Sequence, residues 1–166
     1  MIIETPRLIL REHTLDDAAS VFELNQDFEV VKFTGDHAFN SLQEAKDLIQ
    51  NNIQQQYIKY GYGRWVVIQK SDQQFLGWCG LKYLTDIAET DLGYRLKQSA
   101  WKKGYATEAA LACINFAWSK NIARLIGRAA KENHASINVL EKCGFKHDHD
   151  ELLHGQQGVV YYLNKI

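Results

Sequence analysis

The sequence contains no apolar run close to the roughly 20 residues that a transmembrane helix needs. Its first residues, Met1 to Glu4, also lack the charged and then apolar layout of a secretory signal. The formal net charge is only -1, so the chain has no overall positive field that would draw it to nucleic acid or to an anionic membrane. We therefore expect a cytoplasmic protein without a membrane partner, and nucleic acid stays an option only through a local cluster such as Lys102 and Lys103.

Cysteine and proline are also scarce. The three cysteines, Cys79, Cys113 and Cys143, are odd in number and lie among apolar neighbours, so we expect reduced core thiols. The sequence suggests no His or positive environment that would make one of them a nucleophile. The single proline, and the lack of a linker or an internal repeat, favour one domain over residues 1–166.

The pattern of apolar residues predicts an α/β domain of the α+β kind with a mixed sheet. Capping boxes at Thr14 and Ser41 predict two helices near the start of the chain, with a loop between them over residues 26–40 and a stop at Gly61. A further helix is expected over residues 135–142. Strands are expected over residues 7–11, 64–70, 75–83, 90–96, 124–129, 145–150 and 159–163.

The stretch from Asp91 to Trp118 passes from a short strand through a Lys-rich turn into a long amphipathic helix. The residues expected on the apolar face of this helix are Leu111, Ile114, Ala117 and Trp118. Its first turn is a candidate anion site, because the free N–H groups of residues 105–107 point to one spot where the helix dipole contributes about 0.3 to 1 kcal/mol per charge. Lys102 and Lys103 add positive charge, and Gly104 lets the backbone approach a ligand closely. A phosphate or pyrophosphate suits such a turn, and an ordinary turn with solvated lysines is the alternative.

Two common phosphate loops do not fit this turn, since neither G-x-x-x-x-G-K-[S/T] nor G-x-G-x-x-G occurs here. The segment W-K-K-G-Y-A-T-E-A instead resembles the acyl-CoA pyrophosphate loop of the GNAT superfamily of N-acetyltransferases. Gly104 and Ala106 match the last two fixed positions of the pattern Q/R-x-x-G-x-G/A. Trp101 stands in place of the usual Gln or Arg, a departure that resembles the ribosomal-protein-alanine N-acetyltransferase branch.

Other segments carry the same resemblance. Residues 133–145, N-H-A-S-I-N-V-L-E-K-C-G-F, are similar to the second CoA-side motif of the superfamily, N-x-x-S followed by V-L-E-K-x-G-F. Residues 5–11, T-P-R-L-I-L-R, and residues 27–34 match the same branch. Linked motifs in the right order are far more specific than any one of them alone.

The resemblance implies a single-domain GNAT fold with a mostly antiparallel mixed sheet, a central splayed pair of parallel strands and about four flanking helices. It implies an acetyl-CoA-dependent N-acetyltransferase that moves an acetyl group to a primary amine by direct attack. Acetyl-CoA is then a cosubstrate, its pantetheine arm lies between the splayed strands, and no metal is expected. The residues that the resemblance assigns to CoA are Tyr94, Leu96, Lys102, Lys103, Gly104, Tyr105, Ala106, Thr107, Asn133 and Ser136.

The resemblance identifies the catalytic residues less specifically than the CoA-binding ones. Asp91 is the best candidate for the base that removes a proton from the ammonium, at a position where the family often has Glu. Glu89, two residues earlier on the same strand face, is the fallback. Ser136 is the candidate hydroxyl near the sulfur, with Tyr105 a weaker one, because Leu140 occupies the position where many members have Tyr.

The sequence does not identify the acceptor. The residues expected on its side are the acids Asp27, Glu29 and Asp36, which attract a cationic amine, and the aromatics Phe33, Phe39 and Trp65. A protein N-terminus, an aminoglycoside-like compound, a polyamine and an amino acid all fit. An acyl-CoA-binding or sensing module without turnover is the alternative function, and a homodimer is one option for the oligomeric state.

Residues 147–150 spell H-D-H-D and raise a metal hypothesis. In a regular strand His147 and His149 share one face, while Asp148 and Asp150 share the other, so at most two of the four converge. A solvated strand end is the better interpretation.

Overall fold

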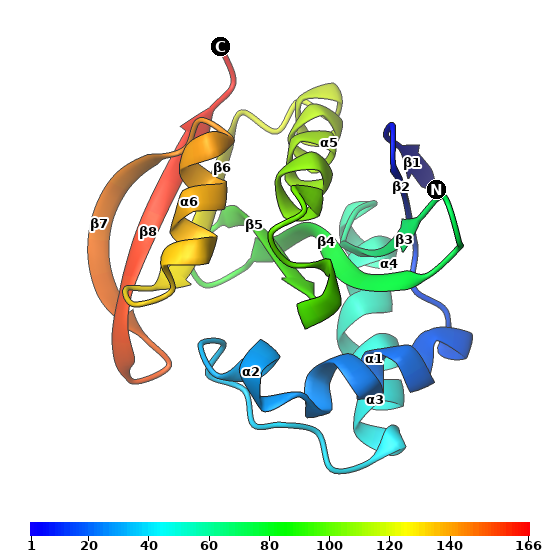
Figure 1. Ribbon diagram of the computed structural model, residues 1–166. Helices are drawn as coiled ribbons and strands as arrows, with labels where there is room; N and C mark the ends of the chain where they lie inside the picture. Colours follow the sequence, from blue (N-terminus) through cyan, green and yellow to red (C-terminus); the bar gives the residue numbers. More distant parts are fainter.

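The computed structural model describes residues 1–166, which form one α/β domain around an eight-stranded sheet in the order β1-β2-β3-β4-β5-β6-β8-β7 (Figure 1). The strands are β1 (Ile2–Glu4), β2 (Leu8–Arg11), β3 (Arg64–Gln69), β4 (Phe75–Leu84), β5 (Glu89–Leu96), β6 (Arg124–Ala130), β7 (Lys146–Leu153) and β8 (Gln156–Asn164). The helices are α1 (Ala18–Gln26), α2 (Phe28–Val31), α3 (Leu42–Leu48), α4 (Gln54–Tyr60), α5 (Tyr105–Ser119) and α6 (His134–Lys142). None of the helices has the length and the apolar character that a membrane crossing needs.

Every pair of neighbouring strands is antiparallel except β5 and β6, which are parallel. These two strands share a single register pair, Asp91 with Ile126, and then separate. On their outer edges β5 stays paired with β4 as far as Leu96, and β6 stays paired with β8 as far as Ala130. The predicted mixed sheet with a splayed parallel pair is therefore confirmed.

The two faces of the sheet have different covers. α5 and α6 pack on one face, where the main core contains Leu92 and Leu96 of β5 together with Cys113 of α5 and Leu140 of α6. α1 and the continuous helical stretch from α3 to α4, joined by a π-helical segment (Ile49–Ile53), form a smaller cluster of their own. The core thiols are confirmed as free and buried, with Cys79 Sγ lying 3.7 Å from Cys113 Sγ.

Three expectations about local structure need correction. The loop over residues 26–40 contains the one-turn helix α2, because the Asp27 carboxylate accepts a hydrogen bond from the Glu29 N–H and caps it. A first strand, β1, precedes the expected one and pairs with β2. Leu111 is 44% exposed, so the buried face of α5 runs instead through small residues such as Ala109, Ala110 and Cys113.

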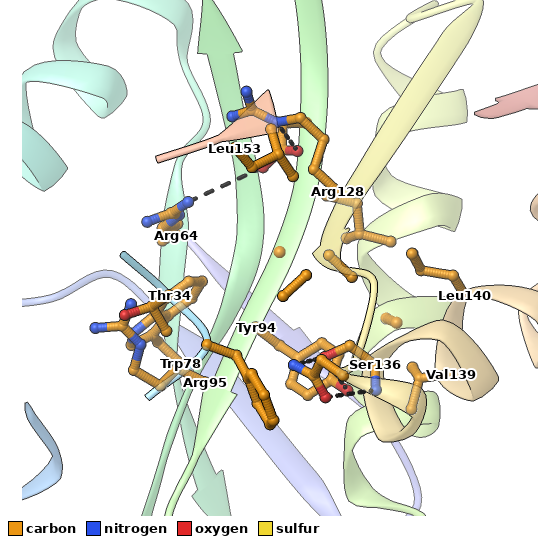
Figure 2. Close-up of a pocket in the computed structure, with 18 of the residues that line it drawn as sticks. Thr34, Arg64, Trp78, Tyr94, Arg95, Arg128, Ser136, Val139, Leu140 and Leu153 are labelled. Atoms are coloured by element: carbon orange, nitrogen blue, oxygen red, sulfur yellow. Dashed lines mark hydrogen bonds and ion pairs between the residues drawn. The ribbon is translucent and has the colours of Figure 1, made fainter. Parts of the chain in front are cut away.

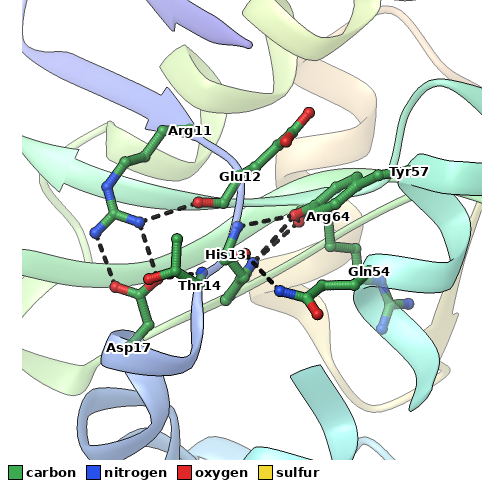
Figure 3. Close-up of polar contacts among 8 residues, drawn as sticks. All are labelled: Arg11, Glu12, His13, Thr14, Asp17, Gln54, Tyr57 and Arg64. Carbon is green, nitrogen blue, oxygen red and sulfur yellow. Dashed lines mark hydrogen bonds and ion pairs between the residues drawn. The ribbon is translucent and has the colours of Figure 1, made fainter. Parts of the chain in front are cut away.

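A polar network joins the end of β2 to the start of β3 (Figure 3). His13, only 2% exposed, places its Nδ1 atom 3.1 Å from the carbonyl oxygen of Arg64, which also accepts a hydrogen bond from the Tyr57 hydroxyl. Beside it, the Arg11 guanidinium forms a two-point ion pair with Asp17, at 2.8 and 2.7 Å. The network fixes the backbone of Arg64, whose side chain lines the cleft described below.

Acid should weaken this network through His13. Burial lowers the pKa of His13 from 6.5 to about 4, so the imidazole is neutral in the folded protein and gains a proton more readily when the chain unfolds. The free energy of unfolding should therefore fall as the pH drops from 6.5 to 4, by an amount on the order of 3 kcal/mol. Urea unfolding at a series of pH values measures this slope.

His13→Asn is the matched variant, because its amide nitrogen can take the place of Nδ1 but does not titrate. It should be less stable at pH 7 and should lose most of the slope between the two pKa values. An unchanged slope would assign the acid sensitivity to other groups.

Candidate functional site

The separation of β5 from β6 opens a cleft of about 960 Å³, including its open mouth (Figure 2). β5, β6 and α6 line it, and two loops close one side. Gln156 Nε2 of the β7–β8 hairpin donates a hydrogen bond to the Phe33 carbonyl oxygen, at 3.2 Å, and Gly35 packs directly against His154. The two loops, far apart in sequence, thereby meet across the cleft.

The backbone of β5 is directed into this opening at alternate residues. The Lys97 N–H donates to the Leu76 carbonyl oxygen at the end of the β4–β5 ladder, so the odd-numbered residues of β5 bond toward β4. The N–H and C=O groups of Leu92, Tyr94 and Leu96 therefore point the other way, toward β6 and the opening. The Leu96 carbonyl accepts a hydrogen bond of 2.8 Å from Trp101 Nε1, which gives a structural role to the residue that departs from the family pattern.

The expected anion site lies at the start of α5. Gly104 has φ of 80°, a left-handed conformation that favours glycine, and its carbonyl oxygen accepts the first helical hydrogen bond from the Glu108 N–H. The N–H groups of residues 105–107 precede that bond and have no helical acceptor. Lys102 and Lys103 are both exposed beside them.

A clamp from the first loop of the chain holds this turn, and the sequence interpretation did not foresee it. Arg7 donates from Nε to Glu108 Oε2 at 2.6 Å and from Nη1 to the Lys103 carbonyl oxygen at 2.9 Å, and Thr5 Oγ1 donates to Glu108 Oε1 at 2.6 Å. The Arg7 guanidinium also lies 4.5 Å from the centre of the Tyr105 ring. That ring is buried in the core, so Tyr105 does not present its hydroxyl to the cleft.

Ser136 lies in the cleft within a small hydroxyl cluster. Its Oγ is 3.2 Å from the Tyr94 hydroxyl and 3.0 Å from Asn133 Nδ2, while Asn133 Oδ1 caps α6 at the Ser136 N–H. Burial raises the pKa of Tyr94, so its hydroxyl keeps its proton at neutral pH. Leu140 packs against Gly127 of β6, where any side chain would collide with it.

Asp91 lies on the opposite face of β5 from Tyr94 and is only 6% exposed. Arg128 of β6 approaches it to 3.3 Å, and Arg64 of β3 to 4.0 Å (Figure 2). Burial raises the pKa of the Asp91 carboxyl above its ordinary value, although Arg128 and then Arg64 act in the opposite direction. Such a carboxyl can exchange a proton closer to neutral pH than an exposed one.

Glu89 does share the strand face of Asp91, as expected, but it is not part of the cleft. Its Oε1 pairs with Arg124 Nε at 3.1 Å. The structure thus brings Asp91 into the cleft with Tyr94, Asn133 and Ser136 and leaves the fallback base outside.

The residues expected on the acceptor side are only partly there. Phe33 lines the cleft, but Trp65 is completely buried on the α5 side, and the strand alternation puts Trp78 in the cleft in its place. The three acids are already engaged: Asp27 with Gln98, Glu29 with Lys32, and Asp36 with Arg95. The functional candidates that the sequence interpretation missed are Arg64 and Arg128, which come from strands far apart in the chain and have no local motif.

The H-D-H-D segment forms pairs with its own neighbours on the exposed strand β7. A register shift between His147 and His149 breaks the regular alternation, so His147 Nε2 reaches Asp150 Oδ1 at 2.7 Å, which a regular strand would prevent. His149 contacts Asp148 and Glu151. No group of three or more His, Cys, Asp or Glu side chains has the arrangement of a metal site.

Known proteins share this architecture. The profile of the acetyltransferase (GNAT) domain matches residues 7–146. An uncharacterized N-acetyltransferase of Bacillus licheniformis, p20, is 30% identical over 144 residues, which cover 86% of this chain and 80% of that protein.

Among solved structures, a GNAT-family acetyltransferase from Bacillus anthracis superimposes with a TM-score of 0.85 at 22% identity, covering 99% of this chain and 98% of that one. RimL, a ribosomal α-N-protein acetyltransferase in complex with coenzyme A, gives a TM-score of 0.82 at 17% identity, covering 99% and 98%. At these identities the two structures support the fold, and the domain match supports the family. The chain therefore belongs to the GNAT acetyltransferase family, and the relative from Bacillus licheniformis is named as an N-acetyltransferase.

Proposed function

We propose that this protein transfers an acetyl group from acetyl-CoA to a primary amine by direct attack of the amine on the thioester. The observation that carries the proposal is the opening between β5 and β6, with a helix start of free N–H groups on one side and a buried carboxylate on the other. Every group in this scheme comes from one chain, so it does not need the homodimer that the sequence left open. The free thiols of the core suit the reducing cytoplasm, where we place the reaction.

The chain offers fitting groups for each part of acetyl-CoA. The N–H groups at the start of α5, with Lys102 and Lys103, suit the pyrophosphate, because they combine helix-dipole charge with two ammonium groups. The inward backbone groups of Tyr94 and the N–H of Leu96 suit the amide groups of the pantetheine arm, while the Leu96 carbonyl oxygen is taken by Trp101. Asn133 and Ser136 lie where the arm would reach the cleft.

The chemistry needs a neutral amine and a stabilised oxyanion. Asp91 takes a proton from the acceptor ammonium, directly or through a water, and the freed lone pair attacks the thioester carbon. An N–H of β5 donates to the oxygen that becomes negative, an effect worth about 3 to 4 kcal/mol per donor in proteases. The C–S bond then breaks and the thiolate accepts a proton. The attacking nitrogen, which became positively charged, loses its second proton to leave the neutral amide, and that proton replaces the one given to the thiolate. Ser136 is our candidate for the donor to the thiolate, and the adjacent Tyr94 hydroxyl adds a second one.

The charge of Lys102 and Lys103 can be tested directly. Replacing both Lys102 and Lys103 by Gln should raise the dissociation constant for acetyl-CoA about tenfold, equivalent to about 1.4 kcal/mol, because two positive charges beside the pyrophosphate are lost. Isothermal titration calorimetry at low salt measures this change. Lys46→Gln with Lys59→Gln, the same charge change on α3 and α4, is the control and should bind as the wild type does. Equal binding by both double variants would remove the pyrophosphate assignment.

The role of Asp91 as the base can be tested by removing its charge. Asp91→Asn should lower kcat by about 10²- to 10⁴-fold while acetyl-CoA still binds, because proton removal loses its acceptor. In the wild type, kcat/KM should fall as the pH drops through the pKa of Asp91, which burial has raised. Release of the CoA thiol with a panel of amines measures both effects.

Glu89→Gln is the comparison, since that carboxylate pairs with Arg124 outside the cleft. It should keep kcat within about twofold of the wild type. If Glu89→Gln loses activity and Asp91→Asn keeps it, the two assignments must be exchanged. If acetyl-CoA binds but no amine accelerates thiol release, the protein is a CoA-binding module rather than an enzyme.

A further inference from the structure

The acceptor face of the cleft has an excess of positive charge. Its lining includes Arg64, Arg95 and Arg128, and the only carboxylate in the lining is Asp91. Arg95 is neutralised, since its Nη2 pairs with Asp36 at 2.8 Å and its Nη1 donates to Asn25. Two guanidinium groups, Arg64 and Arg128, therefore share the single charge of Asp91.

The remaining charges on this face do not restore the balance. Lys82 lies directly opposite Asp91 in the β4–β5 ladder, so its side chain is on the same face. Burial lowers the pKa of Lys82, and Arg64 lowers it further, as expected for an ammonium beside another cation. The cleft therefore disfavours a polycationic acceptor, for which like charges would add an electrostatic cost.

The Arg64 side chain makes no hydrogen bond to another protein group, so its donors are free for a ligand. Its Nη2 is 4.0 Å from Asp91 Oδ2, which is longer than a hydrogen bond, so the contact with Asp91 does not use its donors. Its guanidinium lies 4.2 Å from the centre of a Trp78 ring, which holds it in place, and its Nε is buried without a partner. Burial lowers the pKa of Arg64 to about 10, so it remains charged at neutral pH.

Gly93 leaves room for a ligand between these groups. A Cβ atom at this position would lie 3.6 Å from each of three atoms: Arg64 Nη2, Asp91 Oδ2 and Trp78 Cζ3. A guanidinium, a carboxylate and an aromatic ring thus converge on one point that carries no side chain. Gly93 also lies on β5, next to Tyr94, whose backbone faces the opening.

We propose that the acceptor is a small zwitterion of the α-amino carboxylate type, and that Arg64 selects it by binding its carboxylate. The amino group lies toward Asp91 and the carboxylate toward Arg64, since the two protein groups are close enough for one small molecule to contact both. The contact between the Phe33 loop and the β7–β8 hairpin closes one side of the cleft, which favours a small molecule over a folded protein. This inference rests on the acetyltransferase function proposed above and names its substrate class.

The test uses matched acceptors in the thiol-release assay with wild-type protein. A panel of amino acids is compared with the corresponding amino acid amides, which keep the amine and lose the negative charge, with aminophosphonates, and with a polyamine. We expect kcat/KM for the best acid to exceed that of its amide about 100-fold, because the amide leaves the partly buried Arg64 guanidinium unpaired. Amides or the polyamine reacting as well as the acids would overturn the proposal. A preference for aminophosphonates would overturn the assignment of a carboxylate and show that Arg64 selects a phosphonate-type anion.

Arg64→Gln should reduce the acid-to-amide ratio to within about threefold of unity, mainly by raising KM for the acid. Arg64→Lys should restore part of the ratio, since it keeps the charge but not the planar fork. Arg124→Gln is the control, because it removes an arginine from the same sheet face at the Glu89 pair outside the cleft, and it should keep the wild-type ratio. An unchanged ratio in Arg64→Gln would exclude Arg64 as the selecting residue.

Thermal unfolding with CoA and each acceptor gives a readout that does not depend on turnover. Amino acids should raise the Tm of the wild type and not that of Arg64→Gln, and the amides should raise neither. If no compound accelerates thiol release but the amino acids still raise the Tm, the acetyltransferase proposal fails and the zwitterion site stands. If the amides are the only compounds that turn over, the acetyltransferase proposal stands and the zwitterion site fails. No shift by any amino acid, together with no acid preference in turnover, would exclude the site.

Discussion

The end of strand pairing between β5 and β6 is the constraint on which the rest of this structure depends. Each strand keeps an antiparallel partner on its outer edge, so the sheet stays intact while the inner edges diverge after Asp91 and Ile126. The backbone groups that would have completed the ladder face the opening instead, and buried N–H and C=O groups need partners. A linear ligand with amide groups can supply them, which is the physical reason for placing the pantetheine arm in this opening in our proposal.

The two sides of the opening carry different charge arrangements. On the α5 side the positive charge is local and exposed, from a helix start and two lysines, and the Arg7–Glu108 clamp fixes its backbone. On the other side the charge is largely buried, and three strands contribute Arg64, Asp91 and Arg128. Burial opposes ionisation of Asp91 and the arginines favour it; because burial dominates, its pKa lies above the ordinary value. The same arginines leave an excess of positive charge for the acceptor.

Contacts around the opening keep its groups in place. The His13 and Tyr57 contacts hold the backbone at Arg64, the Trp78 ring supports its guanidinium, and Trp101 occupies the Leu96 carbonyl. Of these residues only Trp101 belongs to a motif recognised in the sequence, and there it departs from the family pattern. Each one limits the positions that a reactive or binding group can adopt, which is what catalysis by orientation requires.

The sequence by itself determined the family, the mixed sheet and the turn that we propose for the pyrophosphate, because that turn depends on contiguous residues from Lys102 to Thr107 whose chemistry is local. It placed Ile114 and Ala117 correctly on the buried face of α5 but put Leu111 there as well, although Leu111 is exposed, and it missed the short helix that Asp27 caps. Only the tertiary structure decided that Trp78 rather than Trp65 lies in the cleft, because the packing of α5 selects which face of the strands is buried. The grouping of Arg64, Asp91 and Arg128 was likewise a tertiary result, since strand pairing alone brings three distant segments to one carboxylate.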